Sequence, residues 1–197
     1  MKPYAEACDR NKQPILEVLR AEFAAARRVL EIGSGTGQHA VFFAAELPHL
    51  CWLSSDRAEN LPGIRAWLDE AGLANALGPI ELDVLGVWPA QRFDAVFSAN
   101  TAHIMSWPAV EAMFRGVGER LEPGGRFALY GPFRYGGRHT SDSNAQFDRW
   151  LKARDPDSGV RDFERLVALA RDNGLAFVRD HAMPANNRLL VWERPLE

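Results

Sequence analysis

Three glycines at alternate positions follow an apolar stretch in "VLEIGSGTGQHA", residues 29–40. Glycine permits positive φ angles and has no side chain, so a ligand can lie directly against the backbone of such a loop. A helix beginning near Gly37 would direct its free amide groups to the same place. The glycines at positions 33, 35 and 37, preceded by the acidic Glu31, therefore predict a strand–loop–helix turn that binds a ligand.

The spacing of the glycines separates two classes of cofactor. Dinucleotide-binding folds use G-x-G-x-x-G, whereas this loop reads G-x-G-x-G and continues with Gln38. An acid two residues before the first glycine would repel a pyrophosphate and attract a cation. Glu31 therefore favours a cofactor with a positively charged group, and a nicotinamide-dependent oxidoreductase stays as an alternative.

Strands and helices alternate along the chain. Apolar or alternating runs predict strands, and apolar residues spaced by three and four predict helices. The expected strands are 28–32, 50–56, 79–84, 92–100, 126–133, 175–183 and 188–194. The expected helices are 14–25, 37–47, 61–71, 110–121 and 160–172, with a short one around 147–151.

This alternation is typical of parallel crossover units in an open sheet. Only "PANN" separates the last two strands, so they should pair antiparallel. We predict one α/β domain over residues 1–197, a Rossmann-like doubly wound sheet of seven strands, mostly parallel, with the last strand antiparallel. Residues 1–25 would form an N-terminal cover and helix, and residues 133–159 a substrate or lid insertion.

Polar residues follow the expected strands at the edge where open parallel sheets bind ligands. Asp56 ends the second strand, Asp83 and Val84 lie at the end of the third, and Asn100 ends the fourth. Each polar residue also fits a local role. Asp56 and Asn100 could cap the segments that follow them, and Asp83 could bond its own loop backbone.

These landmarks, in this order, resemble the motifs of class I S-adenosylmethionine-dependent methyltransferases: "EIGSGTG", "CWLSSD", "ELDVL", "FDAVFSAN" and "LEPGGRFALYGPF". The resemblance covers nearly the whole chain. It implies that the glycine loop wraps the amino-acid end of the cofactor, that Glu31 helps to hold the ammonium group, and that Asp56 binds the ribose. The implied cofactor-binding residues are Glu31, Gly33, Ser34, Gly35, Gly37, Asp56, Asp83, Val84, Asn100 and Asn11.

A narrower resemblance rests on "RNKQPIL", "TSDSNAQFD", "DPDSGVRDFERL" and "MPANN". These segments are similar to the small methyltransferase-like family that includes methyltransferase-like protein 26, whose members are compact class I folds. The resemblance implies cofactor binding and names no substrate. Asn11 and Lys12 precede the first expected helix, in a segment that can fold over the cofactor in compact methyltransferases.

The candidate catalytic residue is His103, which follows the fourth strand near the expected methyl group and can accept a proton near neutral pH. A satisfied buried histidine is the alternative, and His39, in the helix behind the loop, is interpreted as packing on the cofactor side. The polar segments after the fifth strand and in "MPANN" offer the candidate substrate-binding residues Arg138, His139, Ser143, Asn144 and Asn186. A solvated loop with a helix cap at Ser141 or Asp142 fits the same residues.

The amino-acid composition disfavours several classes of binding partner. The 23 basic and 26 acidic residues give a net charge of −3, which disfavours a general nucleic-acid binder. No apolar run approaches the roughly 18 residues that span a membrane. Two cysteines without metal-site spacing favour a reducing compartment. We expect a cytoplasmic S-adenosylmethionine-dependent methyltransferase without a metal. Its first-choice acceptor is a small molecule and its second a protein side chain. A catalytically silent cofactor- or partner-binding module is the alternative.

Overall fold

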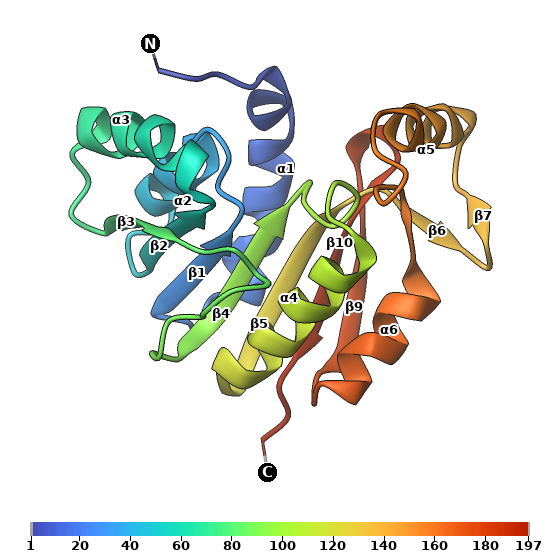
Figure 1. The fold of residues 1–197 in the computed structure, drawn as a ribbon. Coiled ribbons are helices and arrows are strands. Elements are labelled where there is room, and N and C mark those ends of the chain that lie inside the picture. Colours follow the sequence, from blue (N-terminus) through green and yellow to red (C-terminus); the bar gives the residue numbers. More distant parts are fainter. Residues whose placement is uncertain (1, 197) are drawn as a thin grey trace.

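A computed structural model describes residues 2–196, so that Met1 and Glu197, the outer ends of the predicted domain, lie outside the described residues. A seven-stranded sheet forms its centre, with helices on both faces (Figure 1). The strand order is β3-β2-β1-β4-β5-β10-β9. The strands are β1 (Arg28–Ile32), β2 (Cys51–Asp56), β3 (Ala76–Glu81), β4 (Phe93–Ala99), β5 (Leu121–Gly131), β9 (Ala176–Met183) and β10 (Asn187–Glu193).

The predicted fold class is confirmed. β1 pairs in parallel with β2 and β4, and β4 pairs in parallel with β5. β10 lies antiparallel between β5 and β9, so only this last strand is reversed. Two strands had wrong bounds. β3 covers 76–81 rather than 79–84, because Ala76 already pairs with Trp52 of β2, and β5 covers 121–131 rather than 126–133, because Leu121 already pairs with Phe93 of β4. Asp83 and Val84 therefore belong to the loop after the strand.

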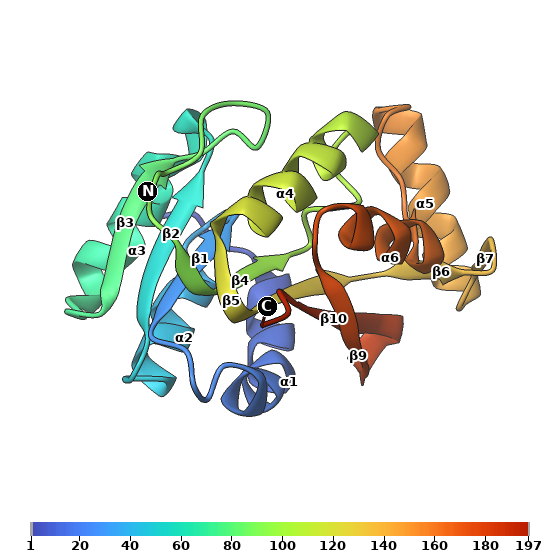
Figure 2. The same cartoon turned by 90° about the horizontal axis from the view of Figure 1, so that it is seen from below.

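The helices separate onto the two faces of the sheet, which Figure 2 shows from below. The helices are α1 (Glu6–Glu22), α2 (Gln38–Glu46), α3 (Leu61–Ala71), α4 (Trp107–Arg120), α5 (Asp142–Arg154) and α6 (Phe163–Asp172). One apolar core lies under α1, α2 and α3, and a second lies under α4 and α6. In the described part of the chain, no helix is long and apolar enough to cross a membrane.

The first helix begins eight residues before the predicted start. The apolar spacing that predicted the helix begins only at Ile15, but α1 continues through Pro14 toward the N-terminus, so Asn11 and Lys12 are helical rather than part of a preceding segment. The acidic residues Glu6 and Asp9 in the first turn favour the positive end of the helix dipole. Burial of the apolar face around Ile15 outweighs the hydrogen bond that the proline cannot donate.

The segment after β5 is more regular than its composition indicated. β6 (Phe133–Tyr135), β7 (Arg138–His139) and β8 (Arg161–Asp162) form a second, three-stranded sheet. The expected short helix around 147–151 is the 13-residue α5. The Ser141 hydroxyl caps this helix by accepting a hydrogen bond from the Asn144 amide at 3.1 Å. The α5 sequence is mostly polar, so apolar spacing predicted only a short part of this helix.

Candidate functional site

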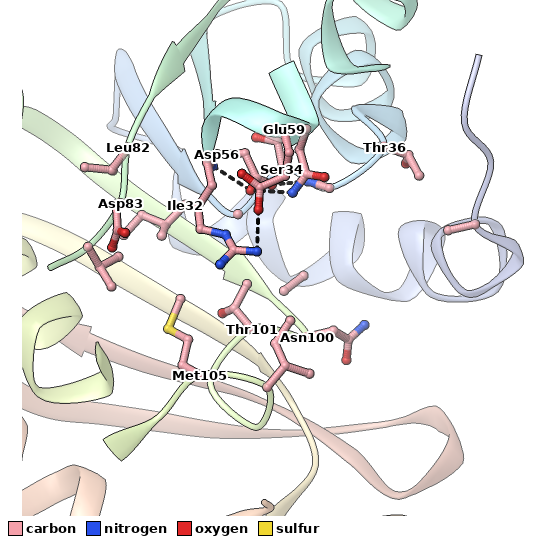
Figure 3. Close-up of a pocket in the computed structure, with 18 of the residues that line it drawn as sticks. Ile32, Ser34, Thr36, Asp56, Glu59, Leu82, Asp83, Asn100, Thr101 and Met105 are labelled. Carbon is pink, nitrogen blue, oxygen red and sulfur yellow. Dashed lines mark hydrogen bonds and ion pairs between the residues drawn. The ribbon is translucent and has the colours of Figure 1, made fainter. Parts of the chain in front are cut away.

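A cavity of about 920 Å³ lies at the carboxyl ends of β1, β2 and β4, between the glycine loop and the start of α4 (Figure 3). The first residues of the chain and of α1 close another side of it. Seven of the residues that the sequence nominated for a cofactor line this cavity: Gly33, Ser34, Gly35, Asp56, Asp83, Val84 and Asn100. The fold therefore brings residues from four separate segments to one hollow.

The three glycines of the loop have different surroundings. All have positive φ, at +71° for Gly33, +59° for Gly35 and +94° for Gly37. A Cβ on Gly33 would come 2.6 Å from the Thr101 side chain, and one on Gly37 would come 3.0 Å from the backbone of Ile64. A Cβ on Gly35 would meet nothing within 4 Å. Gly35 is thus the open point of the loop, while Gly37 closes against α3 outside the cavity wall.

Asp56 joins the end of β2 to the glycine loop. One carboxylate oxygen accepts the Gly35 amide at 2.7 Å. The other accepts the Arg57 amide at 2.7 Å and the Asn60 side chain at 2.8 Å. The carboxylate is 7% exposed and lines the cavity, so it holds the loop in place and faces the hollow at the same time.

Glu31 lies beneath the loop rather than in the cavity wall. One of its oxygens accepts hydrogen bonds from the Trp52 indole and the Ser34 hydroxyl, each at 3.0 Å. Burial raises the pKa of Glu31 to about 7, although these two bonds act in the opposite direction. In the structure, Glu31 positions the side chain of Ser34. A contact between Glu31 and the ammonium group of a cofactor stays a prediction.

The end of the cavity beside β3 is largely apolar. Leu82, Asp83, Ile32 and Met105 surround it (Figure 3). Asp83 accepts the Leu85 amide at 2.9 Å, so the expected loop-backbone bond exists beside its place in the wall. An apolar slot with one carboxylate at its edge suits a flat heteroaromatic ring that carries an amino group.

The fourth strand ends in a sharp turn at Asn100, whose φ is +57°. Asparagine tolerates this left-handed conformation better than most residues. Its amide donates to the Tyr130 carbonyl of β5 at 2.9 Å. The turn leads into the loop 101–106, which lines the cavity through Thr101, Met105 and other residues.

Two other predicted residues lie behind the wall. Asn11 is on α1, where its side-chain oxygen lies 2.7 Å from Nε2 of His39. His103 is 6% exposed and packs edge-on against Phe147, with ring centroids 5.3 Å apart. Burial lowers the pKa of His103 to about 4. The catalytic role of His103 stays a prediction that its position behind the wall does not support.

The five candidate substrate-binding residues belong to the insertion and the β9–β10 turn, outside the cavity wall: Arg138, His139, Ser143, Asn144 and Asn186. Asn144 donates to the Asn186 carbonyl at 3.0 Å, which ties α5 to that turn. His139 lies 3.4 Å from Asp148 of α5. In the described part of the chain, these residues mainly contact one another and their own scaffold.

The sequence predicted an N-terminal cover but named none of the residues that form it. Pro3, Ala5, Ala7 and Cys8 line the cavity, and so does His39, which was expected to pack on the cofactor side. The Pro3 carbonyl accepts the Trp67 indole at 2.7 Å, which fixes the segment against α3. The sequence predicted a cover here only from its position before a helix, because alanines and a proline carry no chemical signal of their own.

Solved structures of methyltransferases share this fold. An O-methyltransferase family protein from Burkholderia thailandensis matches with a TM-score of 0.84 and 19% identity, over 97% of this chain and 58% of that chain. The S-adenosylmethionine-dependent methyltransferase SibL, in its apo form, matches with a TM-score of 0.82 and 24% identity, over 96% of this chain and 56% of that one. PigF with SAH matches with a TM-score of 0.80 and 18% identity, over 94% of this chain and 56% of that one.

The chain thus spans little more than half the length of these proteins, and identities this low establish the shared fold alone. A family model matches far more specifically, over residues 2–194 of the chain. Its description is "Protein of unknown function (DUF938)", and the match covers all the elements that line the cavity. The chain belongs to this family.

Proposed function

We propose that the protein is an S-adenosylmethionine-dependent methyltransferase that transfers a methyl group in line to a small-molecule acceptor. The observation that carries this proposal is the convergence, in one cavity, of the open loop at Gly35, the carboxylate of Asp56 and the apolar slot beside Asp83. Open α/β sheets bind ligands at this edge.

The residues fit the parts of this donor. Asp56 would hold the ribose hydroxyls, and the slot beside Leu82, Asp83 and Met105 would take the adenine ring. The backbone of Gly33 and Gly35 would hold the amino-acid end. The donor supplies an already activated methyl group, so the protein mainly aligns the reactants and excludes water.

A small acceptor is supported by the closure of the cavity. Pro3, Ala5 and Ala7 cover the side next to α1 and α3, which leaves a hollow of small-molecule size. Similar structures include a mitomycin 7-O-methyltransferase and an O-methyltransferase family 2 protein in complex with apigenin. A protein side chain is the second choice of acceptor. The narrower resemblance to the methyltransferase-like protein 26 family and the cytoplasmic location stay predictions.

Thermal stabilisation tests the donor. S-Adenosylmethionine or S-adenosylhomocysteine at 100 times its dissociation constant should add about 2.7 kcal/mol to the free energy of unfolding. NAD should add nothing. A shift with NAD and none with either sulfur compound would replace this proposal by the nicotinamide-dependent alternative.

Turnover is tested with methyl-labelled S-adenosylmethionine and a small-molecule extract. Mass spectrometry should find a product that carries the label and that grows with time and protein concentration. Binding of S-adenosylhomocysteine without any labelled product, across extracts of small molecules and of proteins, would favour the catalytically silent module.

A further inference from the structure

The N-terminal segment, residues 2–8, forms the wall at one end of the cavity. Four of its residues line the cavity: Pro3, Ala5, Ala7 and Cys8. The Cys8 thiol hydrogen-bonds with Thr36 of the glycine loop, and in Figure 3 Thr36 lies at the opposite end from Leu82 and Asp83. The segment therefore borders the place that the proposed function assigns to the amino-acid end of the donor.

The side chain of Gln38 joins this segment to the glycine loop. Its oxygen accepts the Ala5 amide at 2.6 Å and the Thr36 hydroxyl at 3.0 Å. Gln38 is buried, and it stands where a dinucleotide-binding loop has its third glycine. In this protein a side chain at that position fastens a cover over the loop.

One turn of α3 supports both the segment and the glycine loop. A Cβ on Gly63 would come 2.6 Å from Cγ of Pro3. A Cβ on Gly37 would come 3.0 Å from Cα of Ile64 and 3.2 Å from Cβ of Trp67. Because neither glycine carries a side chain, the segment and the loop can both lie directly against this turn.

Trp67 fastens the segment to α3. Its indole donates to the Pro3 carbonyl at 2.7 Å. Nζ of Lys2 lies 3.6 Å from the Trp67 ring centroid and 2.6 Å from Oε1 of Glu70. Glu70 is exposed, and exposed ion pairs contribute little. The indole hydrogen bond and the close contact at Gly63 are therefore the main attachments on this side.

These attachments should affect only one part of the donor. The ribose and the adenine ring would contact Asp56 and the apolar slot, which do not involve the N-terminal segment. A closed wall beside Gly33 and Gly35 would exclude water from the hydrogen bonds that their backbone makes to the amino-acid end, and hydrogen bonds are stronger where the local dielectric constant is low.

We infer that the N-terminal segment encloses the amino-acid end of the donor and that Gly63 and Trp67 are positioning residues, which act through Pro3. The cavity would thereby select the complete donor over a nucleoside that lacks the amino-acid end. This inference rests on the proposed function.

S-Adenosylhomocysteine and 5′-methylthioadenosine are a matched pair of probes, because both carry the nucleoside and the sulfur but only the first has the amino-acid end. Trp67→Phe keeps the ring beside Lys2 and removes the donor to Pro3. It should weaken S-adenosylhomocysteine binding about 2- to 10-fold, the effect of one hydrogen bond, and leave 5′-methylthioadenosine within about twofold. Isothermal titration measures both, and Trp150→Phe, at an exposed site on α5, should change neither.

Gly63→Ala tests the same attachment without removing a hydrogen bond. Alanine is a better helix former than glycine, so a weaker α3 would not explain a loss of binding. The added Cβ should displace Pro3 and lower the preference for S-adenosylhomocysteine over 5′-methylthioadenosine. Thermal unfolding of the unliganded variant checks that it is folded.

Proton exchange of the Trp67 indole gives a measurement on the unchanged protein. Coupling between two sites is reciprocal, so a ligand that the closed segment favours must also favour the closed segment. In NMR, S-adenosylhomocysteine should slow the exchange of this indole proton with water, and 5′-methylthioadenosine should not.

Equal losses for the two ligands, or an unchanged preference for S-adenosylhomocysteine, in either variant would overturn the inference. Equal affinity of the unchanged protein for both ligands would also overturn it and would leave the proposed function in place. Failure of the unchanged protein to bind S-adenosylhomocysteine at all would instead overturn the proposed function.

Discussion

The two buried histidines at the upper edge of the sheet are alike in environment and different in position. His39 and His103 are each 6% exposed, and burial lowers the pKa of both to about 4. His39 lines the cavity with Nε2 fixed by Asn11. His103 lies behind the wall, against Phe147. A lowered pKa therefore does not by itself distinguish a ring that lines the cavity from one that packs behind its wall.

The largest expected effect, common to both histidines, is on stability. Each ring is neutral in the fold near pH 5 and protonated in the unfolded chain, whose pKa is 6.5. The free energy of unfolding should thus fall as the pH drops from 6.5 to 4, by about 3 kcal/mol for each histidine. Urea unfolding at a series of pH values measures this slope, and His39→Leu and His103→Leu should reduce it equally.

Glu31 acts in the opposite direction over nearly the same range. Its pKa is raised from 4.5 to about 7, so its stabilising contribution is lost as the pH rises from 4.5 to 7. The histidine slope should therefore be steeper in Glu31→Gln. An unequal loss of slope in the two histidine variants would show that the environments of the two rings differ despite their equal burial.

The second-largest expected effect is on cofactor binding, and it concerns only residues that line the cavity. Asp56→Ala should weaken S-adenosylhomocysteine binding roughly 10- to 150-fold, because a hydrogen bond to a charged group contributes about 1.5–3 kcal/mol. Asp56→Asn, which keeps the shape and one acceptor, should lose less. Isothermal titration measures both, and His103→Leu serves as the control that should bind normally. Normal binding by a folded Asp56→Ala protein would remove the ribose assignment.

The different positions of the two histidines also show which parts of the site could be predicted from the sequence. Residues at strand ends, such as Asp56 and Asn100, were predicted correctly to converge, because the carboxyl ends of parallel strands share one edge. His103 was favoured for the same reason. His39 follows the loop on a helix and was expected to pack on the cofactor side; it lines the cavity, and its ring packs against Phe43 and Phe97.

The two sheets differ in the same way in how far the sequence predicted them. Apolar periodicity predicted the seven-stranded sheet, whose core side chains are its direct physical signal. It did not predict the small sheet of β6, β7 and β8, which is built from short, partly exposed strands. The N-terminal cover was predicted as a segment, but Ala5 and Ala7 were not singled out, because alanine side chains carry no chemical signal.

A smaller effect distinguishes the histidines through Arg161. Its guanidinium donates to the Ala102 and Met105 carbonyls, and its charge helps to lower the pKa of His103. Arg161→Gln should raise the pKa of His103 and leave that of His39 unchanged, as histidine NMR titration can show. It should also weaken S-adenosylhomocysteine binding about 2- to 10-fold by loosening the loop 101–106.

Arg165→Gln is the matched control for that change. The guanidinium carbon of Arg165 lies 3.5 Å from the ring centroid of Trp107, and this side chain makes no hydrogen bond to the carbonyls of the loop 101–106. Its replacement should therefore change neither the pKa of His103 nor the affinity for S-adenosylhomocysteine. If both substitutions change the pKa of His103 and the affinity for S-adenosylhomocysteine equally, then the positive charge near Trp107 determines these two quantities. The hydrogen bonds from Arg161 to the loop 101–106 would then not determine them.

The smallest expected effect concerns parts of the two segments that the sequence predicted as an N-terminal cover, 1–25, and as a substrate or lid insertion, 133–159. Pro3, Ala5, Ala7 and Cys8 line the cavity, and the Ala5 amide donates to Gln38 at 2.6 Å. Residues 133–144 are held instead by β6, β7 and the Ser141 cap, away from the wall. Hydrogen exchange should therefore show S-adenosylhomocysteine slowing the amides of residues 5–8 and leaving 133–144 unchanged. Protection of 133–144 by the donor alone would bring the insertion, and His103 beneath it, back to the reacting end of the cavity.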